Sequence, residues 1–187
     1  MIYSTIPKQP YDLVYTDPPW QISRGGVKKS RPNSSGKPLD YPTLPLSTIK
    51  DMHSQLNTNN IFMWTIEKYL YQTETMMYSL GYTLHCRIIW DKGRGQAPAY
   101  TLRFTHEYLL WFYKKGHILK PAEDFRGVYP SVIHETNTYH SHKPETAYTY
   151  LETMFPAATK LELFSRQERP GWDSFGNEVK PYDPISA

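Results

Sequence analysis

Short apolar segments alternate with segments of helical periodicity along this chain, and that alternation constrains its fold most. The apolar segments predict strands, which fall at 11–16, 60–65, 84–90, 107–113 and 160–165, with shorter ones near 131–134 and 174–179. Helices are predicted at 47–56, 67–80 and 144–155. Gly81 follows the second helix and is predicted to end it. This alternation predicts an α/β fold with a mostly parallel, doubly wound sheet, as one domain over residues 1–187.

The composition is that of an ordinary globular protein. Hydrophobic residues make up 39% and charged residues 21% of the 187 residues. No apolar run approaches the roughly 20 residues that span a bilayer. Residues 1–8 lack the pattern of a signal peptide, and the single cysteine, Cys86, excludes an internal disulfide. We therefore expect a cytoplasmic protein without membrane contact. The net charge of +3 permits a nucleic-acid partner without implying one.

Asp17-Pro18-Pro19-Trp20 directly follows the first predicted strand. Its carboxylate can accept hydrogen bonds from an amine. Prolines fix φ and supply no backbone N–H, so the local carbonyls are expected to stay free and rigidly aimed. The indole offers a flat face to a planar ring. Together these groups suit the amino group of a nucleobase, and the alternative is a simple turn with Trp20 in the core.

Other polar stretches adjoin the predicted elements. Residues 165–169 follow the strand at 160–165, and residues 140–144 lead into the last helix. Because ligands bind beyond the carboxyl ends of parallel strands, these stretches and Asp17 are expected to line one crevice. The loops at 21–40 and 91–105 are basic and rich in small residues, so they are candidates for phosphate contact rather than merely solvated loops. The candidate nucleic-acid-binding residues are Arg24, Lys28, Lys29, Arg31, Tyr41, Lys92 and Arg94.

Several familiar motifs do not occur in the sequence. It contains neither a Gly-rich phosphate loop ending in Lys-Ser/Thr nor G-x-G-x-x-G. Cys86 lies within a predicted strand with no sign of activation, so it is expected in the core rather than as a nucleophile. His134, His140 and His142 do not match a familiar zinc spacing and have no thiolate nearby in sequence, so no metal site is predicted.

An ordered set of motifs runs through the chain. It consists of Asp17-Pro18-Pro19-Trp20, Tyr41-Pro42-Thr43, Trp64-Thr65, Arg87-Ile88-Ile89-Trp90-Asp91-Lys92, Ser141-His142-Lys143-Pro144-Glu145, Lys160-Leu161-Glu162-Leu163-Phe164-Ser165-Arg166 and Gly171-Trp172-Asp173-Ser174-Phe175-Gly176-Asn177-Glu178. This set resembles the DPPW-type methyltransferase-A family, which includes the catalytic subunit of the eukaryotic mRNA adenosine methyltransferase and small bacterial and phage DNA adenine methyltransferases. The resemblance implies a Rossmann-like fold that uses S-adenosylmethionine, with permuted order: the catalytic motif precedes the cofactor motif.

The resemblance also implies roles for single residues. Asp17 and the Pro18 carbonyl would accept hydrogen bonds from the 6-amino group of adenine, and Trp20 would help hold the base; with Pro19 they form the implied catalytic set. Lys143 would pair with the methionine carboxylate of the cofactor, aided by the N-terminus of the helix that follows. Arg166 would bind the ribose. The implied cofactor-binding residues are Asp17, Lys143, Arg166, Glu168, Asn177 and Glu178.

The implied activity is methyl transfer from S-adenosylmethionine to the 6-amino group of adenine in DNA, by a site-specific DNA methyltransferase. Two alternatives stay open: an RNA adenosine methyltransferase, or a non-catalytic nucleic-acid-binding partner subunit of such an enzyme. The small chain shows no recognisable zinc finger or RNA module, which favours DNA over RNA. Family precedent is compatible with a homodimer. The chain departs from the family's mRNA enzyme at Glu168-Arg169, where that enzyme has His-Asn, and at Glu178, where it has Gln.

Overall fold

The computed structural model describes residues 6–21, 42–93, 102, 104–136, 142–177 and 179–182. In this part of the chain one sheet has the strand order β5-β3-β4-β2-β1-β6-β7. The strands are β1 (Leu13–Thr16), β2 (Asn60–Thr65), β3 (Tyr82–Asp91), β4 (His106–Lys114), β5 (Val132–His134), β6 (Lys160–Leu163) and β7 (Asp173–Phe175). The helices are α1 (Leu46–Ser54), α2 (Leu70–Ser79) and α3 (Glu145–Met154), with 3₁₀ turns η1 (Glu67–Tyr69) and η2 (Glu123–Phe125). The predicted α/β class is confirmed.

The sheet is mostly parallel, as predicted, but one central strand runs the other way. β1 is parallel to both β2 and β6, β6 is parallel to β7, and β3 is parallel to β5. β4 is antiparallel to its two neighbours, β2 and β3. Among the described residues no helix lies between β3 and β4, and antiparallel neighbours do not need the helical crossover that parallel strands require. The antiparallel β4 was not among the predictions.

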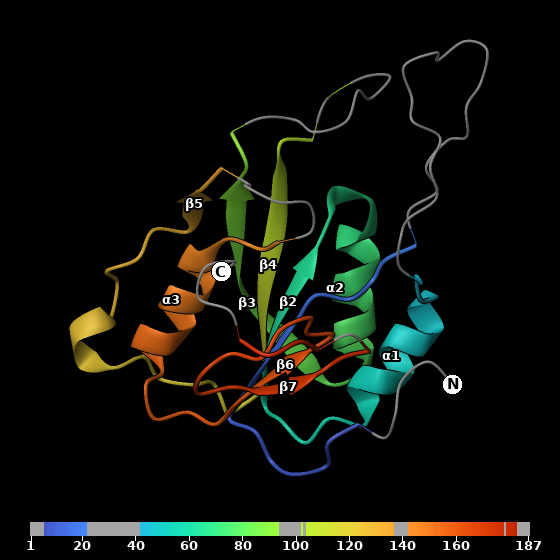
Figure 1. Cartoon of the computed structure of the whole chain (residues 1–187), viewed down its shortest axis with the longest axis horizontal. Helices are drawn as coiled ribbons and strands as arrows, with labels where there is room; N and C mark the ends of the chain where they lie inside the picture. Colours follow the sequence, from blue (N-terminus) through green and yellow to red (C-terminus); the bar gives the residue numbers. More distant parts are fainter. Residues whose placement is uncertain are drawn as a thin grey trace.

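The helices cover both faces of the sheet (Figure 1). On one face Ile49 of α1 and Met77 of α2 belong to the same buried cluster as Val14 of β1. On the other face Leu151 of α3 joins Leu13, the residue before Val14. Successive strand residues point to opposite faces, so the fully buried β1 contributes to both cores. None of the described helices is long and apolar enough to cross a membrane.

Two glycines allow turns that other residues would strain. Gly81 follows α2 with φ of 82°, and its N–H donates to the Tyr78 carbonyl at 3.0 Å, so it ends this helix as predicted. Gly176 follows β7 directly. A Cβ atom there would lie 1.9 Å from the Ser165 carbonyl oxygen, so only glycine lets the end of β7 pass this close to the segment after β6.

Candidate active site

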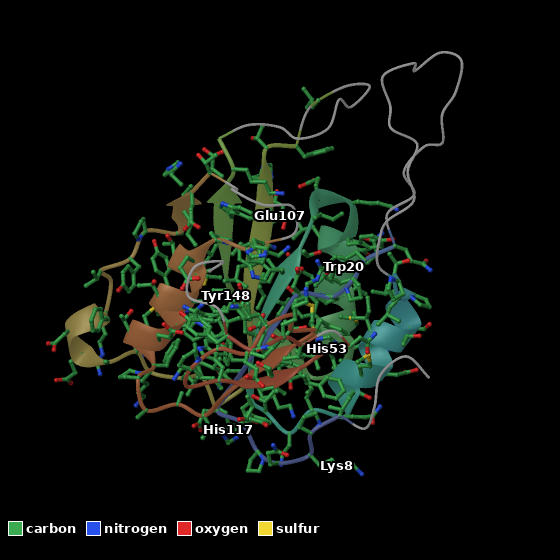
Figure 2. The ribbon with its side chains drawn as sticks, viewed as in Figure 1. Lys8, Trp20, His53, Glu107, His117 and Tyr148 are labelled. Atoms are coloured by element: carbon green, nitrogen blue, oxygen red, sulfur yellow. The ribbon has the colours of Figure 1, made fainter. Side chains whose placement is uncertain are left out.

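The carboxyl ends of two central strands meet at the site. β1 lies between β2 and β6, and Asp17 is the first residue beyond β1. Phe164, the first residue beyond β6, has φ of 68°, which is uncommon for a non-glycine residue and redirects the chain toward Arg166. Because β4 is antiparallel, Glu107 near its start lies at the same end of the sheet as Asp17. Figure 2 shows Glu107 and Trp20 toward one end of the molecule and His117 toward the other.

The two proline carbonyls after Asp17 already accept backbone hydrogen bonds. The Pro18 carbonyl accepts from the Trp20 N–H at 2.8 Å, and the Pro19 carbonyl accepts from the Leu44 N–H at 2.9 Å. The prediction that these carbonyls stay free was therefore wrong. A carbonyl oxygen has two lone pairs, so the Pro18 oxygen keeps capacity for one further donor. The bonds instead fix the turn that aims the Asp17 carboxylate.

Trp20 lies in the core and not on an open surface. Its side chain belongs to the buried cluster beneath α1 and α2, and the residue is 5% exposed. The indole stacks on the Tyr69 ring with centroids 5.1 Å apart, and its Nε1–H donates to the Trp64 carbonyl at 3.2 Å. The sequence predicted a face available to a base, but the Pro-Pro turn directs the indole back against β2 and η1. The structure thus agrees with the alternative of a core tryptophan, which supports the turn from below.

Asp17 and Lys143 form an ion pair. Lys143 Nζ lies 3.0 Å from Asp17 Oδ2 and 2.9 Å from Glu107 Oε2. Glu107 uses its other oxygen to pair with Lys92. The Lys143 ammonium also lies over the Trp64 ring, 5.4 Å from its centroid. Carboxylates and ammonium groups therefore alternate across the ends of β1, β4 and the segment before α3.

Burial and ion pairing have opposite effects on the pKa values of the residues in this network. Burial raises the pKa of Asp17, and the Glu107 charge adds to this effect, while the Lys143 ammonium partly opposes it; the net direction is upward. Burial acts to lower the pKa of Lys143, but the two carboxylates outweigh it and raise that pKa. For Glu107, Lys143 and Lys92 together overcome burial and lower the pKa to about 2. Glu107 and Lys143 are therefore ionised at neutral pH, whereas the pKa of Asp17 is shifted in favour of its neutral carboxyl form.

One cavity of about 360 Å³ opens beside this network and gathers several of the predicted cofactor residues. Asp17, Lys143, Arg166 and Glu168 all line it. Asn177 is exposed after β7 and is not among the lining residues, and Glu178 lies outside the described residues. The lining residues in the described part of the chain are Tyr15, Asp17, Glu135, Thr136, His142, Lys143, Glu145, Tyr148, Glu162, Phe164, Arg166, Gln167, Glu168, Arg169 and Tyr182.

The N-terminus of α3 is already occupied by a carboxylate of the protein. Glu135, just after β5, accepts from the Glu145 N–H at 2.8 Å and from the Thr146 N–H at 3.0 Å. The Thr146 hydroxyl donates to the same side chain at 2.6 Å. The sequence assigned this helix end to the anionic part of a ligand, and the structure instead gives two of its N–H groups to Glu135. A ligand carboxylate near Lys143 would depend on the ammonium itself.

Arg169 is one of the residues at which the sequence departs from the mRNA enzyme of the family that it resembles. Its guanidinium pairs with Glu145 and, at 2.7 Å, with Glu152, both on α3. It also lies over the Tyr148 ring, 4.1 Å from the centroid. Arg169 thus ties the segment after β6 to α3 and forms one wall of the cavity.

The predicted nucleic-acid-binding residues fall mostly outside the described part of the chain. This applies to Arg24, Lys28, Lys29, Arg31, Tyr41 and Arg94. Lys92 is described, and its side chain is 13% exposed because it pairs with Glu107. The structure therefore places Lys92 inside the ion-pair network rather than on an open surface.

The metal and nucleophile candidates have ordinary environments where they are described. His134 pairs with Asp91 at 3.2 Å, and His140 lies outside the described residues. Among the residues with assigned positions, no group of three or more His, Cys, Asp or Glu side chains could hold a metal ion. Cys86 is half-buried against the core on the α3 face, and burial raises its pKa. A raised pKa disfavours the reactive thiolate.

Three acidic residues of the site were missed by the sequence reasoning. Glu107 pairs with Lys143, which lies 36 residues away in the sequence, and no local sequence pattern predicts such a pair. Glu135 caps a helix from the end of a three-residue strand. Glu162 gave a usable signal, because it interrupts the apolar run of β6. Burial raises the Glu162 pKa to about 7, although the Tyr148 hydroxyl donates to it at 2.8 Å.

A charged cavity at the carboxyl ends of adjacent parallel strands is the usual ligand site of a Rossmann-like α/β protein. Here the cavity adjoins a carboxylate on a rigid turn, so a bound ligand and a second reactant can meet at Asp17. The chain belongs to the MT-A70 family, whose family model matches residues 11–178. The resemblance predicted from the ordered motifs is therefore confirmed.

Known relatives agree with this assignment. The chain is 30% identical to the type II methyltransferase M.MunI of a Mycoplasma species, over 95% of this chain and 82% of that protein. It is 25% identical to the human N(6)-adenine-specific methyltransferase METTL4 and 26% identical to the human N(6)-adenosine-methyltransferase catalytic subunit METTL3. These matches cover 95% and 90% of this chain, but only 39% and 28% of the two human proteins.

Proposed function

We propose that this chain is a site-specific DNA methyltransferase that moves a methyl group from S-adenosylmethionine to the 6-amino group of adenine. The observation that carries the proposal is the direct contact between Asp17 and Lys143, which both line the cavity and whose Oδ2 and Nζ atoms lie 3.0 Å apart. One residue stands at the family's acceptor motif and the other at its cofactor motif. Membership of the MT-A70 family and the named activities of the relatives support the same reaction.

The residues of the cavity fit S-adenosylmethionine. Lys143 offers an ammonium to the methionine carboxylate, Arg166 offers donors to the ribose, and Tyr148 and Phe164 supply apolar surface for the rest. A cavity of about 360 Å³ falls within the range of small-molecule sites. S-adenosylmethionine supplies a sulfonium, from which a methyl group is readily displaced. The residues of the protein need only place the acceptor nitrogen in line with it.

Asp17 and the Pro18 carbonyl then act on the acceptor amine. Its lone pair is delocalised into the adenine ring, which makes the nitrogen a poor nucleophile. Hydrogen bonds from its N–H groups to Asp17 and Pro18 localise that lone pair and strengthen as positive charge develops on nitrogen. A bound S-adenosylmethionine would supply the methyl group, and Asp17 would pass the proton that the methylated amine loses on to water. An adenine within a duplex must be flipped out or presented as a single strand.

DNA is favoured over RNA as the substrate because of which relatives the chain resembles. It is 30% identical to the type II methyltransferase M.MunI and 26% identical to METTL3, which is named as an adenosine methyltransferase. We place the protein in the cytoplasm, where such a substrate occurs. A homodimer stays a prediction, to be checked by size-exclusion chromatography with light scattering.

The test is methylation in vitro with labelled S-adenosylmethionine and unmethylated bacterial DNA, followed by chromatography of the nucleosides and mapping of the modified positions. We expect N6-methyladenine at a defined sequence with the native protein, and none with Asp17→Ala. Asp51→Ala is the matched control, because Asp51 is an exposed acid on α1 outside the cavity lining. Near-normal methylation by folded Asp17→Ala would refute the mechanism.

Two other results would select the alternatives. RNA of the same sequence serves as a parallel substrate, and methylation of RNA alone would identify an RNA adenosine methyltransferase. Calorimetry with S-adenosylmethionine addresses the other alternative. No cofactor binding together with no methylation would identify a non-catalytic partner subunit.

A further inference from the structure

Asp17 and Lys143, which the proposed function assigns to two different ligands, form an ion pair with each other in this structure. Asp17 is the acceptor of the adenine amine, and Lys143 is the partner of the cofactor carboxylate, yet Asp17 Oδ2 lies 3.0 Å from Lys143 Nζ. A carboxylate that is paired with an ammonium is a weaker acceptor for a neutral amine, because its charge is already compensated. The ion pair therefore implies that adenine binds well only after the cofactor carboxylate has engaged Lys143.

The surroundings of Lys143 indicate which of its contacts gives way. The ammonium has three N–H groups, and it meets Glu107 at 2.9 Å and Asp17 at 3.0 Å above the Trp64 ring. Glu107 is 14% exposed and is also held by Lys92, so it is fixed from two sides. The Asp17 side chain is 35% exposed and lines the cavity. A carboxylate that enters from the cavity thus competes with Asp17 more readily than with Glu107.

Resting on the proposed function, we propose that Lys143 is also a positioning residue for the acceptor carboxylate and couples cofactor binding to adenine binding. When the cofactor carboxylate takes the Lys143 ammonium, whether by displacing Asp17 or by sharing the charge, the attraction between Asp17 and Lys143 weakens. Asp17 then accepts the 6-amino group fully. Because coupling between two sites is reciprocal, a bound adenine must strengthen cofactor binding by the same factor.

The test compares two probes that differ in the carboxylate. S-adenosylhomocysteine carries the amino-acid group, whereas 5′-methylthioadenosine keeps the adenosine and sulfur but lacks it. The nucleic acid is a duplex with the adenine mapped by the methylation assay, and its affinity is measured by fluorescence anisotropy. We expect saturating S-adenosylhomocysteine to raise that affinity about fivefold or more, and 5′-methylthioadenosine to leave it unchanged. A duplex with purine, which lacks the 6-amino group, in place of that adenine should show no rise with either probe.

Variants assign the effect to the ion pair. In Lys143→Met, saturating S-adenosylhomocysteine should no longer raise the affinity for the duplex. Lys115→Met is the matched control, because Lys115 is an exposed lysine directly after β4, at the end of the sheet away from Asp17, and it should keep the rise. Equal effects of the two probes on the native protein, or an undiminished rise in Lys143→Met, overturn the coupling. If Lys143→Met does not fold, the comparison of probes on the native protein decides alone. A failure of the proposed function is distinct, because the native protein would then methylate no adenine.

Discussion

Replacing Glu107 by glutamine tests how strongly the ion-pair network stabilises the fold. The carboxylate lies between the ammonium groups of Lys143 and Lys92, and the three side chains are 13–14% exposed. Burial alone would raise its pKa, but the two lysines lower it from 4.5 to about 2. At about 1.36 kcal/mol per unit, this drop corresponds to about 3 kcal/mol. Loss of one partner from a buried ion pair has a similar cost. We expect Glu107→Gln to lower the free energy of unfolding by about 3 kcal/mol.

The measurement is urea denaturation followed by tryptophan fluorescence, together with thermal melts, in which Tm should fall by about 6–12 °C. The pH dependence has a definite sign. Because the folded-state pKa of Glu107 is depressed, its stabilisation is complete above its ordinary pKa of 4.5 and is lost as pH falls toward about 2. The stability difference between the native protein and the variant should therefore shrink on acidification below pH 4.5.

Glu123→Gln is the matched control. Glu123 pairs with Arg126 on the surface with its side chain 85% exposed, so its replacement should change stability by less than about 1 kcal/mol. A loss of that small size at Glu107 too, or a difference between native protein and variant that does not change on acidification, would refute the reasoning.

Further substitutions test the other parts of the site. The proposed mechanism requires ionised Asp17, and burial raises the pKa of Asp17. The kcat/KM for methylation should therefore fall on acidification before an ordinary carboxyl group would titrate, and a profile flat to about pH 4 contradicts this. Trp20→Ala should lower the unfolding free energy, measured by urea denaturation, by about 3–5 kcal/mol, and Trp20→Phe should lower it by less. If Trp20→Ala is as stable as the native protein but fails to bind nucleic acid, Trp20 stacks on a base after all. Arg169→Ala should lower the unfolding free energy by about 2 kcal/mol, a value between those for exposed and buried ion pairs. An unchanged Tm would show that the ion pairs of Arg169 with α3 do not stabilise the fold. Gly176→Ala should lower Tm, because its Cβ would lie 1.9 Å from the Ser165 oxygen; an unshifted Tm shows that the segment can move.

Local patterns were sufficient for most of the secondary structure. The largely apolar run before Asp17 became β1, whose four residues are all buried, because a strand covered on both faces is mostly apolar. Gly81 ended α2 because a left-handed residue there costs glycine nothing. The position of Asp17 followed from its place after a strand, and the placement of Lys143 and Arg166 around the same cavity followed from the ordered motifs.

What the sequence did not reveal depends on contacts between distant segments. The direction of the Trp20 side chain is decided by Tyr69 and Trp64, which lie more than 40 residues further along the chain. Glu107 joins the site only because β4 is antiparallel, which brings the start of that strand to the carboxyl ends of its neighbours. The cap by Glu135 likewise requires β5 to stand beside α3. Spacing within a single segment carries no information about such pairs.

The position of β6 has a consequence for synthesis on the ribosome. β1 is made first but has β6 as one of its two neighbours, so its second edge stays open until residue 163 has left the exit tunnel. An open central edge is prone to pairing with other chains. The same delay means that Asp17 emerges long before the segment after β6 that carries Arg166. A nascent chain therefore lacks the proposed cofactor cavity until this segment has emerged, and the proposed methyl transfer can begin only after that point.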